Sequence, residues 1–320
     1  MTDRLVYWAY ALGWGLLKHL PEPVARWLFD RLADYAWRKR GKRVLQLEAN
    51  LRRVRPGLDE AGLRALSRAG MRSYLRYWME SFRLPVWSRE RVARDVQVEG
   101  FELLRAQLEA GRGAVIALPH MGNWDLAGTW VAQLGYPFTT VAERLKPERL
   151  FDRFVAFREG QGMEVLALTG GSVNVIGTLA RRLRAGGLVC LVGDRDLSEA
   201  GIEVSFFGEP TRMPAGPAAL CQRTGAALLP VTLWYDGPVL RGRIHPEVAV
   251  PEEGDRKERT RAMTQAMADV WERGVREHPE DWHMLQKFWL ADLPVRETVR
   301  EPSAVRAEAD PEPAAGASGA

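Results

Sequence analysis

GRGAVIALPHMGNWD, residues 111–125, is the stretch that decides the fold. Two glycines precede the uncharged run AVIALP, which ends at His120. A short apolar run behind a glycine turn predicts a strand buried inside a sheet. A helix is expected to start near Gly122 or Asn123. The stretch is therefore a strand followed by a helix, with one histidine where the strand ends.

The same form recurs along the chain. Residues 186–196 (GGLVCLVGDRD) and 225–235 (GAALLPVTLWY) are apolar runs behind glycines, with helical stretches between them at 148–159 and 173–185. Strands that alternate with helices predict an α/β fold, a central mixed β-sheet flanked by helices. We also expect helices over 59–90 and 257–276, and a strand over 240–250 that Pro246 should interrupt or keep at a sheet edge.

The chain has 320 residues and a formal net charge of +4. We expect one domain over residues 1–294 and a disordered tail over 295–320, where Ala, Glu, Pro and Gly prevail. The apolar run at 5–17 is shorter than the roughly 18–20 residues that span a bilayer, and no signal-peptide cleavage site follows it. The sequence therefore predicts a protein of the cytoplasmic side. The two cysteines, Cys190 and Cys221, are expected to be buried thiols, too few for a zinc site.

Residues 1–56 differ from the rest in charge and in aromatic content. They hold 12 Lys or Arg against 5 Asp or Glu, and four of the Trp residues. Interfacial helices combine these features, so we expect an amphipathic helical segment that contacts an anionic membrane. The alternative is a helical hairpin packed on the domain with a solvated charged face. No nucleic acid partner is expected, because no RNA-binding motif is present.

His120 and Asp125 are the candidate catalytic residues. A carboxylate five residues on can fold back onto the imidazole around the helix start, where it would fix the tautomer and stabilise the imidazolium. An imidazole with an ordinary pKa of roughly 6.5 can take a proton from a hydroxyl. The alternative is a structural histidine bonded to its neighbours.

The setting ALPHMGNWDLAG around this pair resembles the signature of the glycerolipid acyltransferase superfamily. Three further segments, at 142–159, 193–220 and 279–293, are similar to the branch of the bacterial lipid A acyltransferases, and within it to the phosphatidylinositol mannoside acyltransferases. The resemblance covers roughly residues 1–294. It implies a peripheral enzyme on the cytoplasmic face of the cell membrane.

The resemblance also implies a reaction. A palmitoyl group would move from acyl-CoA to the 6-hydroxyl of the mannose on the inositol 2-position of a phosphatidylinositol mannoside. His120 would be the general base, Asp125 would orient it, and neither a metal nor another cofactor would be needed. The alternative acceptor is a lipid A-like sugar or a lysophospholipid.

Further site residues follow from the matching motifs. Arg158 resembles an arginine near the family's catalytic pocket, and Asp194 stands where relatives often carry Glu. Together with Arg195, Asp196 and Arg212, these residues are predicted to bind substrate; the alternative is a surface ion-pair network. For His283 we expect a packed structural role.

Overall fold

The computed structural model describes residues 15–144, 148–168, 174–196 and 201–293. Most of the apolar run at 5–17 and the whole of the predicted tail at 295–320 lie outside the described residues. Among the helices that are described, none has the length and apolar character needed to cross a membrane.

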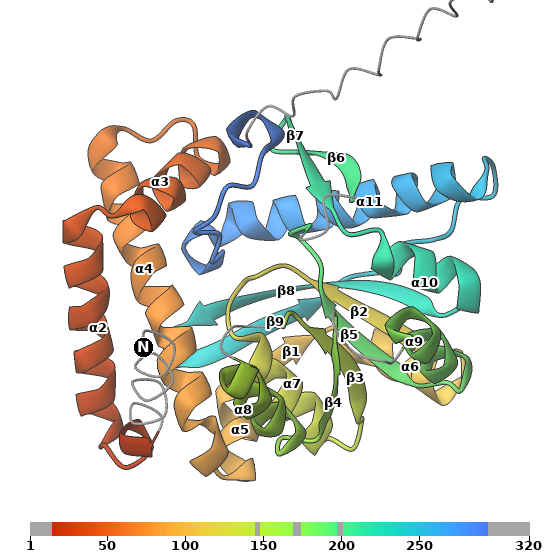
Figure 1. The fold of residues 1–320 in the computed structure, drawn as a ribbon, viewed down its shortest axis with the longest axis horizontal. Helices are drawn as coiled ribbons and strands as arrows, with labels where there is room; N and C mark the ends of the chain where they lie inside the picture. Colours follow the sequence, from red (N-terminus) through yellow and green to blue (C-terminus); the bar gives the residue numbers. More distant parts are fainter. Residues whose placement is uncertain (1–14, 145–147, 169–173, 197–200, 294–320) are drawn as a thin grey trace, which may run out of the picture.

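A seven-stranded mixed sheet forms the centre of the described structure, in the order β1-β9-β8-β2-β5-β3-β4 (Figure 1). Neighbouring strands run parallel except β8 and β9, which pair antiparallel across a turn where Gly237 has a positive φ of 56°. The predicted α/β fold with a central mixed sheet is confirmed. The strands are β1 Val96–Glu99, β2 Ala114–Leu118, β3 Phe138–Ala142, β4 Met163–Ala167, β5 Leu188–Val192, β8 Ala227–Asp236 and β9 Val239–Ile244; a separate hairpin holds β6 Ile202–Phe206 and β7 Glu209–Met213.

β2 is buried on both faces, which explains its unbroken apolar sequence. Ile116 and Leu118 point into one core, and Val115 and Ala117 point into the other. The first core is shared with α5 Arg89–Asp95, α6 Phe101–Glu109, α7 Trp124–Gln133 and α8 Glu148–Glu159; the second is shared with α9 Val175–Arg184, α10 Gly216–Thr224 and α11 Arg256–Glu277.

The N-terminal helices stand beside the sheet (Figure 1). They are α2 Glu22–Lys39, α3 Lys42–Val54 and α4 Glu60–Arg83. Asp34 of α2 is fully buried and accepts hydrogen bonds from Arg68 and Arg72 of α4, so α2 is firmly packed. Its outer side remains open, with Trp27 59% and Tyr35 60% exposed. The predicted helical segment is confirmed over the part of residues 1–56 that the structure describes; its contact with a membrane stays a prediction.

The predicted helices and strands agree with the structure in part. α8 has the predicted bounds, 148–159. The strand predicted over 240–250 ends at Ile244, before Pro246, and it lies inside the sheet between β1 and β8 rather than at an edge. β1, β3 and β4 were not predicted, because runs of four or five residues carry little periodicity. Short 3-10 turns complete the described chain: η1 Leu84–Val86, η2 Pro279–Asp281 and η3 Leu290–Asp292.

Candidate active site

Two neighbouring parallel strands bring a histidine and an aspartate together. Leu118 at the end of β2 pairs with Val192 at the end of β5. His120 and Asp194 each lie two residues beyond these strand ends, so the pairing sets them side by side. The His120 backbone N–H donates to Asp194 Oδ2 at 3.0 Å, and its ring Nδ1 lies 2.5 Å from Oδ1. Functional groups of α/β sheets collect at such carboxyl ends.

Asp194 is completely buried, and hydrogen bonds compensate its charge. Trp282 donates its indole N–H to Oδ2 at 3.0 Å, in addition to the two contacts from His120. Burial by itself raises the pKa of a carboxyl group, but the His120 imidazole and these hydrogen bonds outweigh burial and hold the pKa of Asp194 below its ordinary value. Asp194 is therefore an anion that stabilises positive charge on the imidazole.

The orientation of His120 suits a general base. Because Nδ1 faces the carboxylate, it carries the proton of the neutral ring, and Nε2 is the basic nitrogen. The His120 side chain is 31% exposed and lines a large cavity. A hydroxyl group in that cavity can give its proton to Nε2.

The structure corrects the partner predicted for His120. Among the described residues, Asp125 bonds to Tyr77 and Arg158, and no hydrogen bond joins it to His120. The reason is local: the turn after His120 ends at Asn123, whose side chain accepts from the backbone N–H of Leu126 and caps α7. Asp125 then lies in the first turn of the helix, directed toward α4 and α8. The prediction that Asp125 orients His120 is wrong, and Asp194 does so.

Asp125 instead forms a buried ion pair on the cavity wall. Arg158 Nε donates to its Oδ1 at 2.7 Å, and the Tyr77 hydroxyl donates to Oδ2 at 2.9 Å. Burial alone lowers the pKa of Arg158, but the Asp125 charge outweighs it, and the pKa lies above the ordinary value. Burial and the same carboxylate raise the pKa of Tyr77. Arg158 is therefore a cation, and the Tyr77 phenol is neutral.

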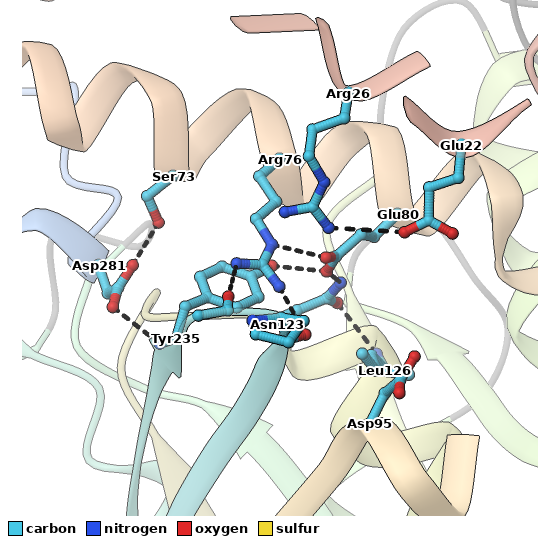
Figure 2. Close-up of polar contacts among 12 residues, drawn as sticks. Glu22, Arg26, Ser73, Arg76, Glu80, Asp95, Asn123, Leu126, Tyr235 and Asp281 are labelled. Atoms are coloured by element: carbon cyan, nitrogen blue, oxygen red, sulfur yellow. Dashed lines mark hydrogen bonds and ion pairs between the residues drawn. The ribbon is translucent and has the colours of Figure 1, made fainter. Parts of the chain in front are cut away.

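A third carboxylate, Glu80, anchors the turn that follows His120. Arg76, Asn123 and Tyr235 converge on it (Figure 2). Their donor atoms lie 2.6, 2.9 and 2.7 Å from the Glu80 carboxylate oxygens. Glu80 is only 3% exposed. Since Asn123 also caps α7, this contact fixes where the helix begins.

Residues 281–283 hold the same turn from the other side. The Gly122 N–H donates to the Asp281 carbonyl at 2.9 Å, and the His283 N–H donates to the His120 carbonyl at 2.7 Å. Between them, Met121 and Trp282 form an antiparallel bridge. His283 is buried, and its ring also borders the cavity, so its predicted structural role stays a prediction.

The cavity beside His120 is large and mostly apolar, with a volume of about 880 Å³. It contains the predicted site residues His120, Asp125, Arg158, Arg195 and Asp196 in its wall. Its apolar wall comes from the sheet and from α4, α7 and α8, and includes Trp78, Ile116, Leu118, Trp124, Gly128, Val131, Phe138, Phe154 and Met163.

The remaining predicted residues divide into two groups. Arg195 reaches Glu143 across the cavity wall at 3.4 Å, and Asp196 accepts from the Gly201 N–H at 2.7 Å. Arg212 lies on β7 opposite Glu203 and is not among the described residues that line the cavity. Within the described ranges, no three His, Cys, Asp or Glu side chains are grouped closely enough to hold a metal ion.

A family model for the bacterial lipid A biosynthesis acyltransferases matches residues 1–291. The chain belongs to this family. The lipid A acyltransferase assignment agrees with the strand-end histidine and the apolar cavity, and it confirms the resemblance that the sequence motifs carry.

Two curated relatives are similar to this chain over nearly its whole length. The phosphatidylinositol mannoside acyltransferase of Mycolicibacterium smegmatis is 48% identical over 286 residues, 89% of this chain and 91% of the relative. The protein with the same description in Mycobacterium tuberculosis (strain H37Rv) is 48% identical over 295 residues, 92% and 91% of the two chains.

Three supporting residues of the site were missed by sequence reasoning: Tyr77, Glu80 and Trp282. Glu80 carried a usable signal, because it is a lone carboxylate in the apolar run YWMESF. A charge on a buried helix face needs partners. Tyr77 and Trp282 carried none, since aromatic residues on apolar faces are usual core residues.

Proposed function

We propose that the protein transfers a palmitoyl group from acyl-CoA to the 6-hydroxyl of the mannose on the inositol 2-position of a phosphatidylinositol mannoside. The observation that carries this proposal is the His120–Asp194 pair at the wall of an apolar cavity of about 880 Å³. A base beside an apolar cavity suits a hydroxyl acceptor and a long acyl chain. The names of the two mycobacterial relatives support the acceptor.

The proposed chemistry needs one base and no covalent enzyme intermediate. His120 Nε2 takes the proton of the mannose hydroxyl as its oxygen attacks the thioester carbonyl. The tetrahedral intermediate then collapses, the carbon–sulfur bond breaks, and the imidazolium returns the proton to the leaving thiolate. Asp194 stabilises the imidazolium between these steps.

The other polar residues of the cavity wall are proposed to hold the substrates. Arg158 is fixed by Asp125 at the wall, so the pair presents a rigid polar surface to the acceptor. Arg195 and Asp196 follow directly after Asp194 and line the same cavity as His120. Arg212 is not among the described residues that line the cavity, and its contact with substrate stays a prediction.

We also propose that the outer side of α2 brings the protein to the cytoplasmic face of the cell membrane. Trp27 and Tyr35 are exposed on this helix, and Tyr35 lies beside its basic end at Arg38 and Lys39. Exposed aromatic rings suit the headgroup layer, and basic side chains suit anionic lipid.

The test is an acyl-transfer assay with purified protein and palmitoyl-CoA, read by mass spectrometry. Acceptors are phosphatidylinositol mono- and dimannosides, a lipid A-like disaccharide and a lysophospholipid. We expect palmitate on the mannose of the mannosides, and none with His120→Ala. Preferred acylation of either of the other two acceptors would overturn the proposed substrate while leaving the acyltransferase assignment.

A further inference from the structure

A second histidine borders the cavity and is held by a chain of hydrogen bonds. His283 is 5% exposed, and its Nε2 lies 3.0 Å from Ser73 Oγ. Ser73 Oγ in turn lies 2.5 Å from Asp281 Oδ1 (Figure 2). The three residues therefore link the cavity wall to a buried carboxyl group.

This chain fixes the tautomer of His283. Burial raises the pKa of Asp281 to about 6, so Asp281 is a carboxylate at neutral pH and only accepts. Ser73 has one hydroxyl proton and donates it to Asp281, which leaves the Ser73 oxygen to accept from His283 Nε2–H. Burial lowers the pKa of His283 to about 3, so the ring is neutral. Its lone pair is therefore on Nδ1.

The Nδ1 atom of His283 is buried and has no hydrogen-bond partner among the described residues. A buried acceptor without a donor is destabilising, and such an atom in a native structure calls for an explanation. The rings that surround His283, Tyr74, Tyr77 and Trp124, all line the cavity as well. None of the described residues supplies that donor, and the His283 ring itself borders the cavity, so a molecule bound there is the candidate donor.

We propose that Nδ1 of His283 accepts a hydrogen bond from a hydroxyl of the acceptor sugar, other than the one that His120 deprotonates. The proposal rests on the function proposed above. The His283 N–H is bonded to the His120 carbonyl, and both rings line one cavity. A sugar whose reacting oxygen is at His120 has further O–H donors within a few bonds. His283 would thus select acceptors and position them.

Two variants separate this role from a structural one. In His283→Asn the amide oxygen occupies the place of Nδ1, while the contact with Ser73 is lost. In His283→Gln the terminal amide reaches Ser73, while the acceptor at Nδ1 is lost. We measure KM and kcat of both variants for phosphatidylinositol mannoside and for palmitoyl-CoA, together with thermal unfolding.

We expect His283→Gln to raise the KM for the acceptor about five- to tenfold, the usual weight of one neutral hydrogen bond. His283→Asn should keep most of the acceptor affinity, and the KM for palmitoyl-CoA should change little in either. The opposite order, with Gln close to the parent and Asn impaired, would show that the ring only supports the fold. A rise confined to the KM for palmitoyl-CoA would also overturn the proposal, since Nδ1 would then accept a hydrogen bond from an amide N–H of the acyl donor.

Acceptors that lack a single hydroxyl test the same contact in the unaltered enzyme. Removal of one hydroxyl other than the reacting one should raise the acceptor KM of the parent enzyme about five- to tenfold. With that deoxy acceptor, His283→Gln should raise the KM no further. Equal tolerance of every deoxy acceptor by the parent would refute the contact. If the parent enzyme acylates a different sugar lipid, the proposed function fails. The acceptor KM values of His283→Asn and His283→Gln, compared on that lipid, still decide the role of His283.

Discussion

One carboxylate holds His120 at two points, since both its backbone N–H and its ring Nδ1 bond to Asp194. The carboxylate is buried, and its own orientation is set by the Trp282 indole. Asp194 therefore contacts the imidazole and orients it, whereas Asp125 contacts Arg158 and Tyr77. Two aspartates near one histidine thus have different tasks, and substitutions separate them.

Asp194→Asn should lower kcat by roughly 10³–10⁴-fold, because an amide keeps the shape but neither fixes the tautomer nor stabilises the imidazolium. His120→Ala should cost about as much, through loss of the base. The double variant should be no slower than the poorer single one, since the two residues act as a unit. Losses that multiply in the double variant would contradict a shared role.

Asp125→Asn should lower the free energy of unfolding. It leaves the buried Arg158 guanidinium without its counter-charge, and breaking such a pair costs about 3–5 kcal/mol. The control is Glu99→Gln, which breaks the exposed pair with Arg243 and should cost less than about 1 kcal/mol. Urea unfolding measures both. Equal small losses would mean that the Asp125–Arg158 pair is not structural.

At the scale of elements, the turn after β2 is held by segments far away in sequence. Glu80 of α4 binds its last residue, Asn123, and residues 281–283 pair with its backbone. The site is therefore only as well ordered as these contacts. Among them, Trp282 is the residue whose side chain bonds to Asp194.

Trp282→Phe tests that contact, because it removes the indole N–H and keeps an aromatic ring. We expect kcat to fall about tenfold, since hydrogen bonds to charged groups are worth about 1.5–3 kcal/mol, with little change in either KM. Trp289→Phe is a matched control: this equally buried indole donates to the Phe206 carbonyl instead. If both variants lose turnover equally, the loss reflects packing.

The basic residues at the junction of α2 and α3 test membrane docking. Replacing Arg38, Lys39, Lys42 and Arg43 with Gln should weaken binding to phosphatidylinositol vesicles at least tenfold at low salt, since each charge near such a surface is worth about 1 kcal/mol. Arg40 is left in place, because it bonds to the buried Glu48.

A variant with four substitutions on α11 controls for overall charge; it replaces Lys257, Arg261, Arg273 and Arg276 with Gln, on a helix away from α2 (Figure 1). It should bind vesicles nearly as the parent does. Unchanged binding of the α2–α3 variant would mean that these residues form a solvated face.

Sequence patterns predicted the two strand ends that carry His120 and Asp194, but not that they meet. A spacing of five residues suggested Asp125 as the partner of His120. The actual partner depends on the order of strands, which places β5 beside β2, and spacing along the chain carries no information about that order. The supports from Glu80 and Trp282 are likewise long-range contacts, set by packing of the whole chain.

For the whole molecule, buried and half-buried titratable groups govern how stability responds to pH. Burial lowers the pKa of His283 to about 3 and that of His245 to about 4, from an ordinary value of 6.5. Below pH 6.5 the unfolded chain therefore binds more protons at these two rings than the folded chain does, and stability falls as pH drops. Asp281, whose pKa is raised to about 6, binds its proton first in the folded state and offsets part of the loss.

We therefore expect the Tm to fall between pH 7 and pH 5. His283→Asn should flatten this dependence, and Asp281→Asn should steepen it, because it removes the offsetting group. Thermal unfolding followed by circular dichroism across this range measures the three slopes. A parent Tm that rises toward pH 5 would contradict the assignment of these groups.

The order of strands also has a consequence for how activity arises. β2 and β3 are consecutive along the chain, yet β5 lies between them in the sheet. The histidine and its carboxylate therefore come from strands that pair although other elements lie between them along the chain. Such non-local pairing is the slow part of folding. We expect a chain in which β5 has not yet paired with β2 to lack the carboxylate that orients His120, so that acyl transfer requires the complete sheet.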